Sequence, residues 1–301
     1  MTGPGDRTPI SVIVLTFNEA ANIATCLESV AGWAGEIFIV DSGSTDQTTE
    51  IARRYTDQIV THPFVNQSQQ FNWALDHLPI HMPWVMRLDA DEFLLPELRE
   101  EIARVLPALA AEVTGVMMKR RVYFQGRWIR HGGYYPTWLL RLFRRGFARS
   151  EELAMDEHIV VLSGKTIELQ HDFVDFNHMS LAEWLAKHAR YAAREASVAE
   201  SGTESTYSAR LTSQPARKRW LKNHVYRRFP PFFRALLFFL YRYILRAGFL
   251  DGPQGLIFHV LQGFWYRFYV DALVWEAHRS ASVDGNPVPG ETGGSGPGAS
   301  S

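Results

Sequence analysis

The sequence has very little cysteine, with Cys26 as the only one among 301 residues. A single thiol cannot form an internal disulfide, which excludes the class of small secreted proteins held together by disulfides and predicts a reducing compartment. The first ten residues, MTGPGDRTPI, lack the basic segment and apolar run of a signal peptide. We therefore expect the chain to stay in the cytoplasm.

Long uncharged apolar runs are also missing. A helix that spans a bilayer needs about 20 consecutive apolar residues. The most apolar stretch is 229–275, and it is interrupted by Arg234, Arg242, Arg246 and Asp251. The sequence therefore predicts no transmembrane helix.

There is almost no excess charge of either sign, because 31 basic residues face 32 acidic ones. The distribution is uneven. Residues 1–115 hold 6 Lys and Arg against 16 Asp and Glu, and residues 116–301 hold 25 against 16. This asymmetry indicates different tasks for the two halves. No recognised nucleic-acid-binding module accompanies the basic half, so we expect no nucleic acid partner.

Strands and helices alternate in the first third of the chain. Apolar runs at 11–15, 37–40 and 84–88 predict strands buried on both faces of a parallel sheet. Helical spacing of apolar residues predicts a helix near 23–30, and a further helix is expected to start near Ser44 with Gln47 completing a capping box. The predicted fold class is therefore α/β, built from βαβ units.

Polar residues follow each predicted strand, at the edge where ligands bind in such sheets. They are the segment 16–19, Asp41, and the pair Asp89 and Asp91. Two carboxylates directly after a buried strand are costly unless they meet a cation. Hard oxygen ligands suit Mg²⁺ or Mn²⁺ shared with a diphosphate. The alternatives are solvated loop carboxylates and, for Asp41, a carboxylate that interacts with a helix dipole.

Three segments, SVIVLTFNEAANIATCLESV, IVDSGSTDQT and WVMRLDADEF, resemble glycosyltransferase family 2, the inverting enzymes with the GT-A fold. The resemblance implies a Rossmann-like nucleotide-sugar-binding domain and a Mg²⁺ or Mn²⁺ ion held by Asp91 with Asp89. It also implies contacts to the donor nucleotide from Thr16, Asn18, Glu19, Asp41, Gln70 and Asp89. Phe71 stands where many relatives have a basic residue, which removes one expected cation on the donor side.

The resemblance continues into the second half of the chain. Residues 126–146 are similar to the acceptor-side segment of the bacterial branch that glycosylates lipopolysaccharide core and related envelope glycans. The string MDEHIVVLSGK is similar to the segment that carries the catalytic base, which implies Glu157 in that role, with Asp156 as the alternative. The implied acceptor-binding residues are His131, Tyr134, Trp138 and Arg141. With Arg144, Arg145 and Arg149, Arg141 is expected to form a basic cluster that binds phosphates.

The C-terminal region has the pattern of amphipathic helices. A helix over 232–247 would have a wide apolar face edged by arginines, and a second helix would follow the break at 251–253. This pattern is typical of helices that lie in a membrane interface. The alternative is a helical pair packed on the catalytic domain or on a second copy. We expect a GT-A domain at 8–228, membrane-associating helices at 229–279 and a disordered tail at 280–301.

The expected activity is that of a metal-dependent inverting transferase. The donor would be a UDP-hexose such as UDP-glucose, and the acceptor a lipid-linked glycan such as lipopolysaccharide core. The enzyme would be peripheral, at the cytoplasmic face of a bacterial inner membrane and bound to the membrane surface through residues 229–279. The alternatives are transfer to a polyprenyl-diphosphate-linked oligosaccharide in exopolysaccharide assembly, or a catalytically silent membrane-bound scaffold.

Overall fold

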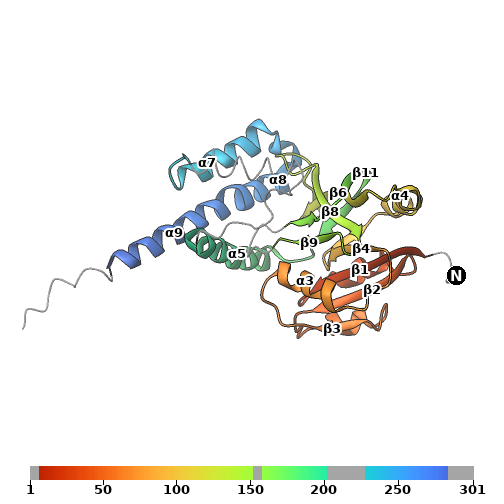
Figure 1. The fold of residues 1–301 in the computed structure, drawn as a ribbon. Coiled ribbons are helices and arrows are strands. Elements are labelled where there is room, and N and C mark those ends of the chain that lie inside the picture. Colours follow the sequence, from red (N-terminus) through yellow and green to blue (C-terminus); the bar gives the residue numbers. More distant parts are fainter. Residues whose placement is uncertain (1–6, 152–157, 202–227, 284–301) are drawn as a thin grey trace, which may run out of the picture.

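The structure, a computed structural model, describes residues 7–151, 158–201 and 228–283. A large sheet forms one part of the molecule, and the C-terminal helices lie together beside it (Figure 1). The strands are β1 (Thr8–Thr16), β2 (Ala34–Asp41), β3 (Ile59–Thr61), β4 (Trp84–Asp89), β5 (Glu92–Leu94), β6 (Val113–Phe124), β7 (Arg127–Trp128), β8 (Thr137–Arg144), β9 (Ala148–Ser150), β10 (Ile159–Val161) and β11 (Lys165–Phe176). The α-helices are α1 (Ile23–Glu28), α2 (Thr48–Ala52), α3 (Gln67–His77), α4 (Pro96–Val105), α5 (Leu181–Ser201), α7 (Phe233–Leu240), α8 (Gly252–Phe258) and α9 (Tyr266–Val283).

The main sheet has the strand order β3-β2-β1-β4-β8-β6-β11-β5, with β7 paired to β6. Strands β1 to β4 are parallel neighbours, which confirms the predicted βαβ arrangement. Strand β8 is antiparallel to both β4 and β6, and β6 is parallel to β11. The carboxyl ends of β1, β2, β4, β6 and β11 therefore lie at one edge of the sheet.

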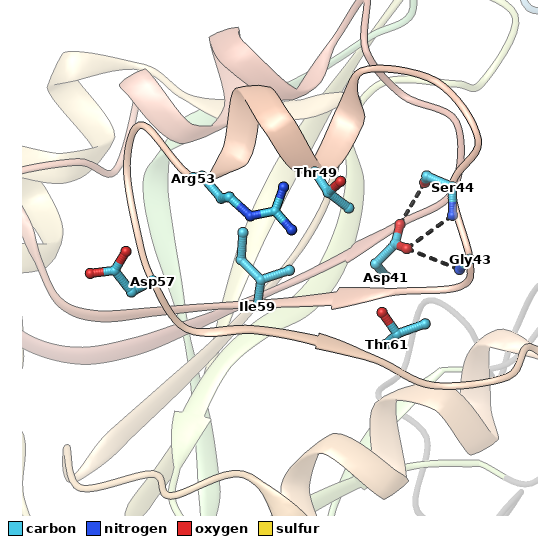
Figure 2. Close-up of a pocket in the computed structure, with 8 residues that line it drawn as sticks. All are labelled: Asp41, Gly43, Ser44, Thr49, Arg53, Asp57, Ile59 and Thr61. Atoms are coloured by element: carbon cyan, nitrogen blue, oxygen red, sulfur yellow. Dashed lines mark hydrogen bonds between the residues drawn. The ribbon is translucent and has the colours of Figure 1, made fainter.

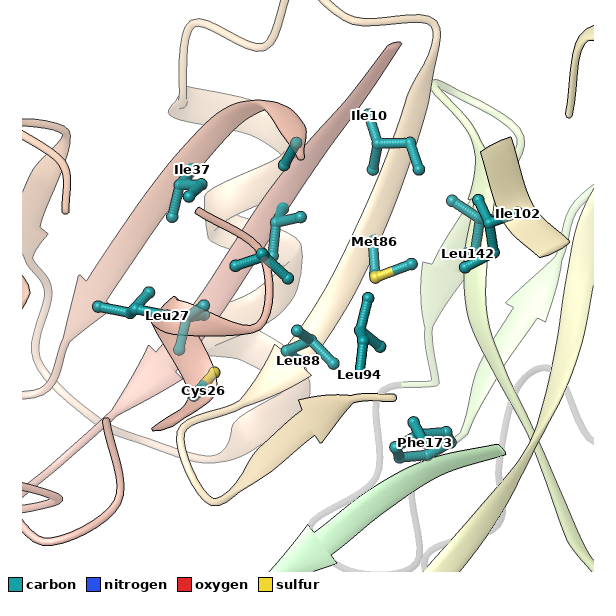
Figure 3. Packing of buried hydrophobic residues seen from close by; sticks show 14 of the residues in the cluster. Ile10, Cys26, Leu27, Ile37, Met86, Leu88, Leu94, Ile102, Leu142 and Phe173 are labelled. Carbon is teal, nitrogen blue, oxygen red and sulfur yellow. The ribbon is translucent and has the colours of Figure 1, made fainter. Parts of the chain in front are cut away.

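Apolar side chains cover both faces of this sheet. Figure 3 shows one face, where Leu27 of α1, Met86 of β4, Ile102 of α4 and Phe173 of β11 are all buried in one cluster. Cys26 belongs to the same cluster and is 1% exposed. On the other face, α3 packs its buried residues into a second cluster. Both faces of the strands that lead to Asp41 and Asp89 are therefore buried.

The helix predicted from Ser44 begins later, at Thr48. The Ser44 hydroxyl donates to Asp41 Oδ1 and accepts from the Asn18 backbone N–H, so it is not free to cap a helix. Asp46 instead accepts hydrogen bonds from the backbone N–H and the hydroxyl of Thr48. The predicted capping box with Gln47 is therefore wrong.

The C-terminal helices form where the sequence predicts them, with different winding. The helix expected over 232–247 is α-helical in α7 and π-helical over Tyr241–Leu245, and a 3₁₀ turn, Gly248–Asp251, precedes α8. A second π-helical segment, His259–Trp265, leads into α9. Helix α9 continues to Val283, which lies beyond Ser280, the predicted first residue of the tail.

Helix α5 packs along α9, and its Trp184 also contacts Phe124 at the end of β6. Ala192 of α5 is buried with Tyr266 and Val270 of α9. Glu195 accepts hydrogen bonds from the Tyr266 hydroxyl and from Arg267. Within the described ranges, no helix combines the length and the apolar character needed to cross a membrane.

Candidate active site

The loop after β2 is organised by the carboxylate of Asp41, which is 2% exposed. Its Oδ2 accepts from the backbone N–H groups of Gly43 and Ser44 at 3.0 and 2.9 Å, as Figure 2 shows. Asn18, at φ 53, accepts a hydrogen bond from Thr45 N–H through Oδ1. Asp41 and Asn18, both predicted to contact the donor nucleotide, thus hold together the loops that follow β1 and β2.

A cavity of about 340 Å³ opens beside this loop. Its lining is polar and comes from β2, α2, β3 and the loops between them: Asp41, Gly43, Ser44, Thr49, Arg53, Asp57, Ile59 and Thr61 (Figure 2). Thr16 lies opposite Asp41 in the β1–β2 register, and its buried hydroxyl has no hydrogen-bond partner in the described part of the chain. A hydroxyl left unpaired in this way is suited to a ligand that brings its own polar group.

Gln70, also predicted to contact the donor nucleotide, is 1% exposed, and both ends of its side-chain amide have hydrogen-bond partners. Its Nε2 donates to the Ser42 hydroxyl and to the His62 carbonyl, and its Oε1 lies 2.8 Å from His62 Nδ1. In the structure Gln70 braces the strand-end loops. Phe71, which stands in the position of the missing cation, is buried, and Arg87 lies over its ring at 5.5 Å.

Asp89 belongs to a buried charge network. Arg87 Nε donates to Asp89 Oδ1 at 3.1 Å, and Arg141 Nη2 donates to Asp89 Oδ2 at 3.0 Å. Arg141 also donates to Glu92 Oε1 at 2.5 Å, and Glu92 Oε2 accepts from Asp89 N–H. Although burial raises it, the pKa of Asp89 is held well below its usual range by the two guanidinium groups.

This network corrects the prediction for Arg141. The sequence places Arg141 in an acceptor-binding basic cluster, whereas its side chain is buried between Asp89 and Glu92. Nor do the other three arginines share a patch with it. Arg144 donates to Val113 O, Arg145 to Ile80 O, and Arg149 pairs with Asp76. The cluster fails because each of these arginines has partners of its own, distant in sequence.

Replacing Arg141 by leucine should therefore destabilise the protein by about 3–5 kcal/mol, because two buried carboxylates lose a shared partner. Urea unfolding of the variant and of R141L/E92L measures this. The double variant, which removes one of the stranded carboxylates, should recover part of the loss. A single variant as stable as the wild type would contradict the importance of the network.

Asp91 lies beside a different set of groups. Its Oδ2 accepts from Asn177 Nδ2 at 2.8 Å, and its carbonyl accepts from Phe176 N–H at 2.9 Å. Burial and the charge of Asp91 raise the pKa of Glu19 to about 7. Burial also raises the pKa of Asp175 to about 6, and Asp91 adds to that rise. Burial alone would lower the pKa of Lys187, but the nearby negative charges, Asp91 foremost, raise it above its ordinary value.

These shifts indicate whether the residues suit a divalent cation. Glu19 and Asp175 are difficult to ionise next to Asp91, so added positive charge at this point would be favourable. Within the described residues no three His, Cys, Asp or Glu side chains form a complete metal site. Asp91 can therefore supply one protein ligand of a cation whose remaining ligands come largely from a diphosphate and water, as is usual for Mg²⁺.

Two of the predicted acceptor residues, His131 and Tyr134, lie between β7 and β8 and contact the C-terminal region, whereas Trp138 and Arg141 lie within β8. His131 Nδ1 is 2.6 Å from Asp251 Oδ1, and the Tyr134 ring packs against Phe258 and under Arg242. Lys119 lies over Trp138 at 5.6 Å. The proposed bases, Asp156 and Glu157, lie outside the described residues.

Several residues at this edge escaped sequence reasoning. Arg87 lies inside the predicted strand at 84–88, Glu92 lies just beyond its end, and Asp175, Asn177 and Lys187 lie far along the chain from Asp91. A hint was available for Arg87, because a charge inside an otherwise apolar strand must find a partner. The pairing of the others depends on the antiparallel half of the sheet.

Comparison with known proteins places this geometry in context. Residues 11–163 match the model of the family described as Glycosyl transferase family 2. The chain is 28% identical, over 90% of its length and 94% of the relative's, to the lipopolysaccharide core biosynthesis glycosyltransferase LpsC of Rhizobium meliloti. An uncharacterized glycosyltransferase of Rickettsia felis is 38% identical over 31% of this chain and 32% of its own.

Among solved structures, the mannosyltransferase PcManGT from Pyrobaculum calidifontis, in complex with GDP-Man and Mn²⁺, is similar with a TM-score of 0.50. The identity is 17%, and the match covers 94% of this chain and 89% of that one. At this level of identity the likeness shows the fold, a GT-A-like mixed α/β architecture with a largely parallel sheet.

Proposed function

Because the chain belongs to glycosyltransferase family 2 and is a glycosyltransferase, we propose that it transfers a hexose, with inversion, from a UDP-linked donor to a lipid-linked glycan such as lipopolysaccharide core. The observation that carries the proposal is the convergence of Asp41, Asp89 and Asp91 at one edge of the sheet. The lipopolysaccharide core transferase of Rhizobium meliloti, similar along nearly the whole chain, supports the acceptor class.

In this proposal the cavity at Asp41 holds the donor nucleoside. Asp41 and the unpaired hydroxyl of Thr16 offer hydrogen-bond partners for a ribose or a base. Arg53 adds a positive charge to the lining. The donor would then extend along the strand ends toward Asp91.

Asp91 would be the protein ligand of a Mg²⁺ or Mn²⁺ ion, with Asp89 beside it. When bound, such an ion stabilises negative charge on the leaving diphosphate. Asp89 is held ionised by Arg87 and Arg141 and is therefore a permanent hydrogen-bond acceptor for the ribose or a bound water. Asn177 orients the Asp91 carboxylate through its hydrogen bond to Oδ2.

Thermal-shift measurements with a panel of nucleotide sugars, each with and without Mn²⁺, test the donor assignment. A true donor stabilises the folded state by mass action, by about 2.7 kcal/mol at a concentration 100 times its Kd. UDP-glucose with Mn²⁺ should give the largest shift. A larger shift with a GDP-linked or CMP-linked sugar would overturn the choice of UDP.

We also place the enzyme at the cytoplasmic face of the inner membrane, attached through 229–279. Many large apolar side chains in this region are exposed, including Leu245 at 77%, Leu250 at 54% and Trp275 at 55%. Two of the three arginines expected at the lipid headgroups have partners within the protein. Arg234 pairs with Asp271, and Arg242 stacks on Tyr134. Apolar insertion would therefore dominate attachment.

The double variant L245E/L250E should bind vesicles of phosphatidylglycerol and phosphatidylcholine at least tenfold more weakly than the wild type, since each leucine buried from water contributes about 1.5–3 kcal/mol. Sedimentation with vesicles measures the bound fraction. F147E, at an exposed phenylalanine between β8 and β9, is the matched control. Equal sedimentation of all three proteins would contradict attachment through this surface.

A further inference from the structure

We infer that a basic cluster beside the acceptor segment binds a phosphate or carboxylate group of the acceptor glycan; the inference rests on the proposed transfer to such a glycan. The cluster, here called the 119–135 cluster, consists of the side chains of Lys119, Arg121, Trp128, Arg130, Tyr135 and Asp172.

The 119–135 cluster lies at the same edge of the sheet as the donor site. Lys119 and Arg121 are in the carboxyl-terminal half of β6, and Lys119 is paired with Asp172 of β11. Because side chains alternate along a strand, Arg120 points to the opposite face. There it pairs with Asp175, which lies close enough to Asp91 for the Asp91 charge to raise its pKa. Strand β6 thus separates the 119–135 cluster from the diphosphate site.

Asp172, only 3% exposed, is fully used inside the cluster. Its carboxylate is 2.6 Å from Arg121 Nε and 3.4 Å from Lys119 Nζ. It also accepts a hydrogen bond from the Tyr135 hydroxyl at 3.1 Å. The cluster holds three cations and one carboxylate, so two positive charges remain without a matching negative charge among its members.

The excess charge is concentrated around Trp128. The guanidinium groups of Arg121 and Arg130 both lie 4.6 Å from the centre of the Trp128 ring. Within the described ranges, Arg130 makes no hydrogen bond, and Trp128 Nε1 is buried without a hydrogen-bond partner. Two like charges at one ring, next to an unpaired donor, form a set of groups that an anion would satisfy together.

A sugar that carries such an anion fits this arrangement well. The Trp128 and Tyr135 rings are in edge contact, with centroids 5.1 Å apart, and they offer apolar area for the sugar ring. The guanidinium groups have the planar geometry that recognises phosphate and carboxylate. The same residues could meet a lipid headgroup phosphate, and the experiment must separate these sources.

The test uses the full-length R130Q and R121Q variants, with R104Q as the matched control, since Arg104 is an exposed arginine on α4. Lipopolysaccharide core glycolipid serves as the acceptor in three forms: untreated, dephosphorylated with aqueous hydrofluoric acid, and carboxyl-reduced. KM is measured for each form of the acceptor. The rate of UDP release from the UDP-hexose without acceptor is measured separately.

We expect R130Q to raise KM for the untreated acceptor about tenfold, the cost of one charge-assisted hydrogen bond. The treatment that removes the recognised anion, either dephosphorylation or carboxyl reduction, should raise KM for the wild type. It should also abolish the difference in KM between the wild type and R130Q. R104Q should match the wild type. R121Q should behave as R130Q does, and a folding defect in R121Q alone would leave the R130Q result decisive.

Two results would overturn the inference. One is an unchanged KM of R130Q for the untreated acceptor. The other combines two observations on R130Q: it no longer binds phosphatidylglycerol vesicles, and its KM is normal for the acceptor glycan from which the lipid has been removed. That combination would assign the cluster to a lipid headgroup. Failure of the proposed function itself looks different, because the wild type would then neither release UDP from a UDP-hexose nor transfer to any of the three acceptors.

Discussion

Replacing Asp91 by asparagine is expected to lower kcat/KM for sugar transfer about a thousandfold or more. In the proposed site this carboxylate is the protein ligand of the divalent cation, and the amide of asparagine is a neutral and much weaker ligand. Stabilisation of the leaving group by such an ion contributes several kcal/mol, and about 4 kcal/mol corresponds to a thousandfold in rate. UDP release from UDP-hexose in the presence of Mn²⁺ and acceptor measures the effect.

The structure indicates that D91N should fold normally. The asparagine oxygen can still accept the hydrogen bond from Asn177, and the backbone bond to Phe176 is unaffected. Removing the negative charge also eases the ionisation of Glu19, whose pKa of about 7 is partly due to Asp91. A carboxyl group with a raised pKa destabilises the folded state as pH rises from its ordinary value of 4.5 through 7. In D91N without metal, this gain at pH 8 opposes the loss of the attraction between Asp91 and Lys187, so we expect a stability close to that of the wild type.

Glu97→Gln is the matched control, because Glu97 is an exposed carboxylate on α4 and lies outside the site. It should leave activity unchanged and lower stability by at most about 1 kcal/mol, because Glu97 lies in the first turn of α4 and interacts with the helix dipole. A D91N protein that folds normally and keeps more than a tenth of wild-type activity with Mn²⁺ would contradict the assignment of Asp91.

Glu157→Gln is expected to lower transfer by about 10²–10⁴-fold while leaving donor binding intact. Inverting transfer is a single displacement in which the acceptor hydroxyl loses its proton as the new bond forms, and a positioned carboxylate accepts that proton. Glutamine keeps the shape of the side chain but cannot take the proton. Initial rates with saturating donor, together with the donor-induced thermal shift, separate the two effects.

Asp156→Asn is the comparison that decides between the two candidates in this segment. We expect the smaller effect from D156N. If D156N abolishes transfer and E157Q does not, the base is Asp156; if both variants transfer at the wild-type rate, the base lies elsewhere in the chain.

The parallel half of the sheet could be predicted from the sequence, and the antiparallel half could not. Strands β1, β2 and β4 are rich in apolar residues, because both of their faces are buried. Strand β6 instead carries Lys119, Arg120 and Arg121 in its second half. A strand over 113–123 could still be predicted, but the partners of these charges become clear only once Asp172 and Asp175 of β11 are placed beside them.

The same distinction applies to the candidate site. The strand-end positions of Asp41, Asp89 and Asp91 follow from the order of strands and helices, and all three lie at one edge. The partner of a charge does not follow, because it is set by tertiary contacts. Arg141 was expected at the acceptor, yet it is paired with Asp89, 52 residues away in sequence. Arg234, expected at a membrane surface, pairs with Asp271 for the same reason.

The most direct test of the central claim is a crystal structure of the protein with UDP and Mn²⁺, with the cation located by anomalous diffraction at the manganese edge. The account predicts one peak about 2.1 Å from an oxygen of Asp91 and bridging to the diphosphate, and no such peak in D91N grown with the same ligands. A manganese peak away from Asp91, or a diphosphate bound equally well in D91N without a cation, would contradict it.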